Sequence, residues 1–344
     1  MKERIDLRSD TVTEPTQEMR DAMYTAAVGD DVFGEDKTVM ELENLAAEML
    51  DKESGLFVAS GTMGNLISVL CHTKPGDEAM MDKKAHIYYF ERGMSTIAGV
   101  TPVPLESDHG VVRPDHIREQ LRGASGHESD VALLCLENTH NLRGGTVSTV
   151  AEMNETCSFA KEHGMKIHLD GARLFNAAVA LGVPAKDLAG GADSVMVCLA
   201  KSLCAPVGSV LVGSGDFIKK ARHWRSILGG GMRQAGVIAA AGIVALRTMV
   251  DRLAVDHDNA KFLGQELNKM PGFKVNESLT QTNLVYCELD QGLDSPQRFE
   301  LKMRELGMYC FAASQTELRF CTHKDVTRQQ IESAIGIIKQ VYKK

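Results

Sequence analysis

Two short apolar runs in this sequence each lead to an ionisable residue. Ile167-His168-Leu169 stops at Asp170, and the run 195–199 is followed two positions on by Lys201. Such runs are typical of strands buried on both faces of a parallel sheet, and ligands bind at the carboxyl ends of these strands. Pyridoxal phosphate chemistry needs a lysine that forms an imine with the cofactor and a carboxylate that keeps the pyridine nitrogen protonated. Asp170 and Lys201 are candidates for these two roles; a salt bridge or a solvated strand end is the alternative.

A glycine-containing turn nearer the start of the chain has the pattern of a phosphate site. Residues 56–59 read as a strand, and Ser60-Gly61-Thr62-Met63-Gly64-Asn65 follows, with a helix that we expect to begin near Gly64. Glycines let backbone amides approach an anion at a helix N-terminus, where the dipole favours phosphate. A tight turn that binds nothing is the alternative. The position of this motif ahead of the Asp170 and Lys201 strands favours the phosphate interpretation.

Two histidines are further candidates. His86 follows the strand at 79–81 in an aromatic cluster, where its ring would either stack on a planar cofactor or pack as a core side chain. His127 lies in a glycine-rich loop, where a solvent-facing histidine is the default expectation. A histidine would suit a cofactor site at either position, but the sequence position alone does not decide between a functional and a structural role.

Two arginines occupy distinctive settings. Arg233 follows three glycines, a run that suits a backbone passing close to a ligand or a neighbouring subunit, with a flexible loop as the alternative. Arg319 alternates with the apolar residues Leu318 and Phe320, so it projects from one face of a strand. A surface arginine is the alternative there.

An open α/β sheet would position these residues. Seven candidate strands, separated mostly by helical patterns, predict a mainly parallel sheet; they span 56–59, 79–81, 100–103, 131–136, 167–169, 195–199 and 209–212. Helices are expected at 16–26, 39–50 and 237–246, the second preceded by a capping box of Thr38 and Glu41.

The last hundred residues have a different character. Helices at 252–269, 296–306 and 327–341 alternate with short strands at 282–288, 308–311 and 317–322, an order that predicts a compact α+β domain. We therefore divide the chain into a polar arm (1–15), a large domain (16–249) and a small domain (250–344).

The composition excludes several classes of protein. The 344 residues are 44% hydrophobic and 24% charged with a net charge of −8, which argues against nucleic acid or an anionic membrane as partner. We find neither a signal peptide nor an apolar stretch approaching the ~20 residues of a membrane helix. Eight scattered cysteines without a Cys/His cluster indicate reduced thiols in the cytoplasm, with no metal site.

Taken together, motifs along nearly the whole chain resemble the low-specificity or L-allo-threonine aldolases. These are fold-type I pyridoxal phosphate enzymes with an aspartate aminotransferase-like fold. The resemblance implies a seven-stranded, mainly parallel sheet and a smaller C-terminal α+β domain. The similar segments are 6–11, 28–32, 60–65, 137–141, 168–173, 200–208, 230–234 and 318–325.

The resemblance also implies roles for single residues. Lys201 would form the imine, Asp170 would face the pyridine nitrogen and His86 would stack on the ring. Gly61 and Thr62 would bind the phosphate, with Arg233 from an adjacent subunit. The substrate carboxylate would be bound by Ser9, Arg173 and Arg319. His127 would lie near the β-hydroxyl. Two positions depart from the family: Phe33 stands where tyrosine is common, and Arg225-Ser226 where an Arg-Lys pair is common.

The reaction that the resemblance implies is retro-aldol cleavage of L-threonine or L-allo-threonine to glycine and acetaldehyde. His127, His86 and a bound water remain alternatives for the general base. Another reaction on the same fold, β-elimination or transamination, is the rival within enzymes, and a non-catalytic binding protein is the rival outside them. The family also implies a homotetramer with each active site at a subunit boundary.

Overall fold

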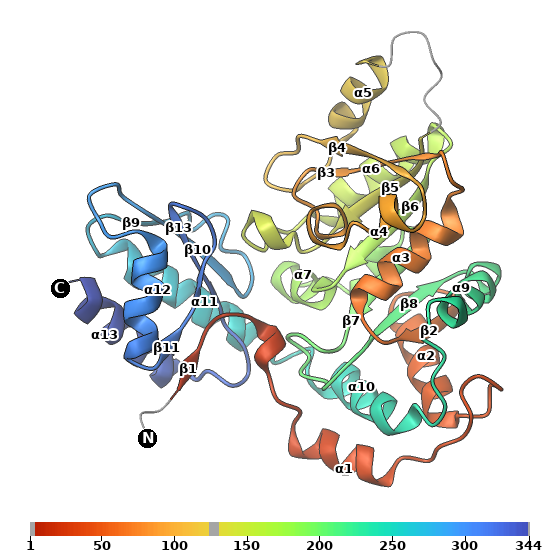
Figure 1. The fold of residues 1–344 in the computed structure, drawn as a ribbon, viewed down its shortest axis with the longest axis horizontal. Coiled ribbons are helices and arrows are strands. Elements are labelled where there is room, and N and C mark those ends of the chain that lie inside the picture. Colours follow the sequence, from red (N-terminus) through yellow and green to blue (C-terminus); the bar gives the residue numbers. More distant parts are fainter. Residues whose placement is uncertain (1–3, 124–130, 343–344) are drawn as a thin grey trace.

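The computed structural model describes residues 4–123 and 131–342. Two sheets with their covering helices make up the molecule, a larger body formed by the first two thirds of the chain and a smaller one formed by the rest (Figure 1). The N-terminal segment lies against the smaller body before the chain enters the larger one (Figure 1).

The larger body is built on a seven-stranded sheet with the order β2-β8-β7-β6-β5-β3-β4. Only β8 runs antiparallel to its neighbours. The mainly parallel α/β sheet predicted from the sequence is therefore confirmed, and all seven expected strands are present. They are β2 (Ser54–Val58), β3 (Glu78–Asp82), β4 (Thr101–Leu105), β5 (Val131–Glu137), β6 (Lys166–Gly171), β7 (Ser194–Cys198) and β8 (Ser209–Gly213).

Helices cover both faces of this sheet. In chain order they are α1 (Gln17–Thr25), α2 (Lys37–Met49), α3 (Gly61–His72), α4 (Gly93–Thr96), α5 (Pro114–Gly123), α6 (Val150–Glu162), α7 (Leu174–Leu181), α8 (Ala185–Ala189), α9 (Gly215–Ile227) and α10 (Gly236–Thr248). The strands between them are almost fully buried, as their apolar sequences require, except β4, which lies at the edge of the sheet and is only partly buried.

Two expected helix starts were wrong. Helix α2 is capped by Asp36, whose Oδ1 accepts from Val39 N at 3.0 Å, whereas Thr38 lies inside the helix and donates to a carbonyl. Helix α3 starts at Gly61 rather than near Gly64, because Ser60 caps it by accepting from the amide of Met63. In both cases a side-chain acceptor further upstream wins the capping position.

The smaller body contains an antiparallel sheet of order β12-β13-β10-β9, covered by α11 (Leu253–Asn268), α12 (Pro296–Glu305) and α13 (Arg328–Tyr342). Its strands are β9 (Phe273–Val275), which the sequence analysis missed, β10 (Leu284–Leu289), β12 (Phe311–Ala312) and β13 (Glu317–Cys321). The strand expected at 308–311 is divided, because β11 (Met308–Tyr309) leaves this sheet and pairs in parallel with β1 (Ile5–Asp6).

Each body has its own apolar core. Ile5 and Leu7 of the arm are buried in the core of the smaller body, which explains how this polar segment is held. The division into domains at residues 15 and 249 stays a prediction. All eight cysteines are free thiols, seven of them buried. None of the described helices combines the length and apolar character needed to cross a membrane.

Candidate active site

A cavity of about 320 Å³ lies at the edge of the large sheet where β6 and β7 end. Since these strands are parallel, Asp170 on β6 and Lys201, just after β7, reach the same edge. Five residues predicted from the sequence line this one cavity: Gly61, Thr62, His86, Asp170 and Lys201. The arm contacts the backbone beside it, because Thr13 Oγ1 lies 3.1 Å from the carbonyl oxygen of Lys201.

Two N–H groups orient the Asp170 carboxylate. Its Oδ2 accepts from Asn65 Nδ2 at 2.8 Å, and its Oδ1 accepts from Ala172 N at 3.0 Å. Asn65 is fully buried in the second turn of α3 and also donates to Glu91 Oε1 at 3.0 Å. Sequence reasoning missed the roles of Asn65 and Glu91, although Asn65 closes the glycine motif already singled out.

His86 is held at the cavity by two glutamates. Its Nδ1 lies 2.8 Å from Glu91 Oε1, and its backbone N–H donates to Glu137 Oε2 at 2.6 Å. Burial acts to lower the pKa of His86, but the hydrogen bond to Glu91 and the charges of Asp170 and Glu137 raise it overall. A raised pKa keeps this imidazole able to hold and release a proton near neutral pH.

The N-terminus of α3 faces the same cavity. An added Cβ on Gly61 would lie 2.9 Å from Cys198 Sγ and 3.0 Å from Met196 Cε, so glycine allows the first turn to pack closely on β7. Gly208, with a φ of +100°, lines the cavity opposite. Unpaired amides at a helix N-terminus bind anions.

A second cluster joins the arm to both sheets. Arg173 donates from Nε and Nη2 to the two oxygens of Asp10, at 2.8 and 2.7 Å. Arg173 Nη1 and Arg319 Nη2 point at a single oxygen, Oδ1 of Asn141, at 3.4 and 3.2 Å. Arg319 also donates from Nη1 to the carbonyl of Arg8 at 2.9 Å. The two arginines predicted to hold a carboxylate therefore converge, and both are almost fully buried.

Burial and charge act in opposite directions on the Arg173–Asp10 pair. Burial alone would raise the pKa of Asp10, but the Arg173 charge and hydrogen bonds from Arg173 and Ser202 hold it well below its usual range. Burial lowers the pKa of Arg173, and Asp10 more than compensates, so this pKa is raised. Asp10 is a site residue that the sequence analysis did not identify.

The other predicted residues lie elsewhere. Ser9 precedes Asp10, and its hydroxyl accepts from Thr11 N at 3.2 Å. Arg233 is largely exposed, bonds Asp30 at 3.1 Å and does not line the cavity of its own chain. His127 lies outside the described residues.

The structure also shows where the two residues that depart from the family pattern lie. Phe33 is 74% exposed. Arg225 is buried and donates to Phe57 O, and its Nη2 lies 2.7 Å from Asp31 Oδ2. Its charge therefore stabilises the structure behind the cavity.

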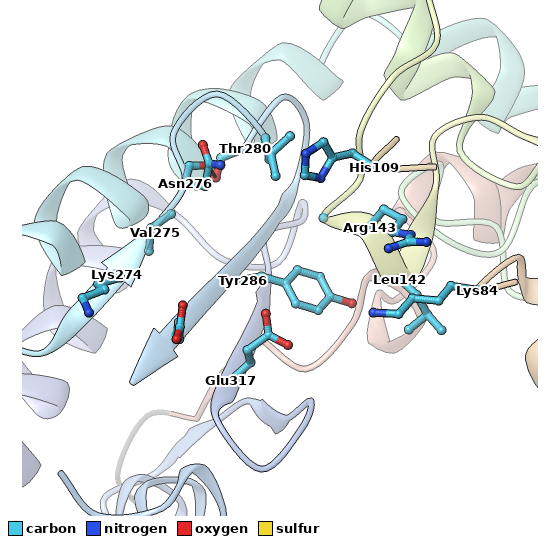
Figure 2. A pocket seen from close by; sticks show the side chains of 13 residues that line it. Lys84, His109, Leu142, Arg143, Lys274, Val275, Asn276, Thr280, Tyr286 and Glu317 are labelled. Carbon is cyan, nitrogen blue, oxygen red and sulfur yellow. Dashed lines mark hydrogen bonds between the residues drawn. The ribbon is translucent and has the colours of Figure 1, made fainter. Parts of the chain in front are cut away.

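A larger cavity of about 450 Å³ opens between the two bodies (Figure 2). Lys84, His109 and Arg143 of the larger body face Tyr286 and Glu317 of the smaller one there (Figure 2). None of the residues predicted from the sequence lines this cavity, so the candidate site is the smaller one.

The group His86, Glu91 and Asp170 has the residue types of a cation site, with one ligand atom from each within 4.8 Å of the others. However, the Asn65 amide already donates to Glu91 Oε1 and to Asp170 Oδ2. The arrangement fits a planar ring with a protonated nitrogen better than a metal, because the carboxylates are already bridged by a neutral donor.

Sequence comparison identifies the family of the chain. The family model of the beta-eliminating lyases matches residues 6–290. Low-specificity L-threonine aldolase 1 of Arabidopsis thaliana is 43% identical over 98% of this chain and 96% of that protein. The low specificity L-threonine aldolase of Escherichia coli K12 is 39% identical over 95% and 96% of the two chains.

Comparison with solved structures agrees on the fold. The threonine aldolase of Leishmania major has a TM-score of 0.83 at 20% identity over 98% and 99% of the two chains. A serine palmitoyltransferase of Sphingomonas wittichii has a TM-score of 0.77 at 17% identity, covering 98% of this chain and 87% of that one. Fold-type I topology, expected from the resemblance, is thereby confirmed.

Proposed function

Since the chain belongs to the beta-eliminating lyases and, among them, to the low-specificity threonine aldolases, we propose that it cleaves L-threonine and L-allo-threonine to glycine and acetaldehyde. The observation that carries the proposal is the shared cavity of Lys201 and Asp170. A pyridoxal phosphate-dependent lyase needs an amine to capture the cofactor and a carboxylate to face its ring nitrogen, and these two side chains supply both.

The cofactor is pyridoxal 5′-phosphate, and the residues present fit it. An amine, a carboxylate, an imidazole and a helix N-terminus all border one cavity of about 320 Å³. When bound, this cofactor accepts the electron pair released at the substrate Cα. Lys201 would hold it covalently, Asp170 would face its ring nitrogen, and His86 would lie against the ring. Gly61 and Thr62 would bind its phosphate.

The arginine pair supports an α-amino acid as the substrate. Arg173 Nη1 and Arg319 Nη2 converge on Asn141 Oδ1, and the same donors suit a carboxylate oxygen. A carboxylate fixed by two guanidinium groups sets which bond at Cα faces the cofactor ring. Ser9, beside Asp10 on the arm, would add a hydroxyl to this carboxylate site.

Cleavage also requires a base for the β-hydroxyl proton. His86 supports one assignment, because it borders the cavity and its pKa is raised. His127 and a bound water remain the alternatives. Replacing His86 and His127 separately with Phe, and comparing kcat for threonine, assigns the step: the base is the residue whose loss lowers kcat about 10²-fold or more.

Trapping the covalent link tests the proposal. The purified protein is loaded with pyridoxal phosphate, reduced with borohydride and digested, and the labelled peptide is mapped. We expect the label on Lys201 and none in Lys201→Ala, whereas Lys186→Ala, at an exposed position, should be labelled like the parent. Acetaldehyde and glycine from threonine identify the aldolase; a keto acid or ammonia would identify transamination or β-elimination instead.

We also propose that the protein works in the cytoplasm as a homo-oligomer, a tetramer with each active site at a subunit boundary. Exposed apolar side chains lie on α1, α9 and α10 and on the segment between α1 and α2, and α1 packs against α10; we call this set of side chains the apolar patch. This apolar patch consists of Tyr24, Val28, Val32, Phe33, Ile227 and Val237. Two of its members lie beside the Arg233 loop: Arg233 lies over the Phe33 ring at 5.9 Å, and Gly231 lies beside Val32.

A further inference from the structure

A chain of hydrogen bonds runs between α3 and the adjoining face of the large sheet and ends at Asp170. His72 Nε2 lies 2.8 Å from Ser194 Oγ, and Ser194 Oγ lies 2.9 Å from His168 Nδ1. His168 Nε2 lies 3.0 Å from Asn65 Oδ1, and Asn65 donates to Asp170. Ser194, His168 and Asn65 have no solvent exposure.

The direction of these bonds follows from the Asn65 amide. Its Nδ2 faces two carboxylates, Asp170 and Glu91, so its oxygen must face His168. His168 Nε2 therefore carries a hydrogen. Because burial lowers the pKa of His168 to about 3, the ring is neutral at pH 7 and its Nδ1 is an acceptor. The Ser194 hydroxyl donates to that nitrogen.

The outer end of the chain is ordered in the same way. Ser194 Oγ, having donated its hydrogen to His168, accepts from His72 Nε2. Burial lowers the pKa of His72 to about 4, and Asp193, Lys166 and Lys220 are the charged groups nearest to it. His72 is also fixed by stacking on Phe217, with ring centroids 4.7 Å apart. A rigid side chain thus sets the tautomer of His168 from outside the site.

We propose that His168 is a positioning residue for the cofactor site. An amide does not pass protons along such a chain, so the chain orients the Asn65 side chain. If His168 did not donate to it, Asn65 would be free to turn over and present its oxygen to Asp170 and Glu91. An acceptor facing two carboxylates is unfavourable, and Asp170 would shift from the position in which it would face the ring nitrogen.

The inference rests on the proposed function, since it concerns the carboxylate assigned to the cofactor ring. The discriminating pair of variants is His168→Leu, which fills the space without a donor, and His168→Gln, whose amide N–H can still reach Asn65. His257→Leu is the matched control, because His257 also bonds a buried asparagine, Asn176, but does so between α7 and α11.

The measurements are the dissociation constant for pyridoxal phosphate, the absorption spectrum of the bound cofactor across pH, and the melting temperature of the cofactor-free protein. We expect His168→Leu to weaken cofactor binding about tenfold and to change the spectrum and its pH dependence. His168→Gln should stay within about threefold of the parent, and His257→Leu should bind as the parent does.

Two results would overturn this inference but leave the proposed function standing. One is a His168→Leu protein with the parental cofactor affinity and spectrum and only a lowered melting temperature. The other is an equal loss of cofactor affinity in His168→Leu and His168→Gln. If His168→Leu does not fold, Ser194→Ala takes its place, with an expected weakening of about threefold and the same contrary outcomes. A parent protein that takes up no cofactor would overturn the proposed function as well.

Discussion

Arg173 and Asp10 form a bidentate ion pair that ties the N-terminal arm to the carboxyl end of β6. Two further donors converge on Asp10 Oδ2, namely Ser202 Oγ at 2.6 Å and Asn283 Nδ2 at 3.2 Å. Asp10 therefore connects the arm with the loop after β7 that contains Lys201 and Ser202, and with Asn283, the residue before β10. Because both oxygens of Asp10 bind Arg173, the guanidinium is held with its remaining edge toward Asn141 and Arg319.

Replacing Asp10 should damage both stability and substrate binding. Asp10→Asn leaves Arg173 buried without a counter-charge, and breaking a buried pair in this way costs about 3–5 kcal/mol. We expect a fall of that size in the free energy of unfolding, and a rise in KM for threonine of at least about tenfold because Arg173 is no longer held. The control is Asp21→Asn on the exposed side of α1. A variant with parental unfolding and parental KM would contradict the role given to Asp10.

The buried histidines predict how stability depends on pH. Burial lowers the pKa of His72 to about 4, against about 6.5 in the unfolded chain. Between these values the unfolded state binds more protons, so stability is full above about pH 6.5 and is lost as the pH falls toward 4. From pH 6.5 to 5, the loss due to His72 is about 1.6 kcal/mol.

Denaturant titrations of the cofactor-free protein at pH 6.5 and 5 measure this effect. We expect His72→Gln to lose about 1.6 kcal/mol less than the parent over that interval, since glutamine does not titrate. The same substitution at exposed His163 serves as the surface reference. Equal losses in the parent and in His72→Gln would show that His72 takes up its proton equally in both states.

The fold and the residues that line the cavity could be predicted, because the sequence patterns that mark them are local. Apolar runs such as 195–199 mark buried strands wherever they occur, and an Asp or Lys at their ends is placed by the parallel topology alone. Gly61 and Thr62 were predicted by the same logic, from a strand leading into a helix.

The residues that hold the cavity-lining side chains in place could not be predicted, since their partners are distant in sequence. Asp10 meets Arg173 across 163 positions, and Asn65 meets Asp170 across 105. Nothing near Asp10 or Asn65 marks them as buried partners. The N-cap of α2 was predicted wrongly for a related reason. Asp36 and Thr38 are both good capping residues, and only the hydrogen bond from Thr38 to the distant carbonyl of Ala27 removes Thr38 from that role.

Gly61 should be intolerant of even one added methyl group. In Gly61→Ala the new Cβ would meet Cys198 Sγ at 2.9 Å, so either Cys198 or the first turn of α3 must shift. We expect an affinity for pyridoxal phosphate at least about tenfold lower, measured by equilibrium titration, because the amides at the helix N-terminus are displaced. Gly336→Ala, in an open position on α13, should bind normally and gain about 0.5–1 kcal/mol of stability. Unchanged affinity in Gly61→Ala would exclude this turn as the phosphate site.

The apolar patch should hold subunits together. Tyr24 is 91% and Phe33 is 74% exposed in a single chain, and large exposed apolar groups mark protein interfaces. We expect the double variant Tyr24→Asp with Phe33→Asp to sediment as a smaller species than the parent. Leu301→Asp, at an isolated exposed position on α12, should not change the mass. Identical sedimentation of the double variant would place the interface elsewhere.

Arg233 offers a direct test of an active site shared between subunits. It does not line the cavity of its own chain, and its bond to Asp30 leaves it largely exposed beside the apolar patch. If it serves the neighbouring subunit, Lys201→Ala and Arg233→Ala chains damage opposite halves of each site. After unfolding and refolding together in equal amounts, half of the dimers are mixed and each mixed dimer has one intact site, so activity should return to about a quarter of the parental value. A mixture no more active than the two variants refolded separately would show that Arg233 acts within its own chain or not at all.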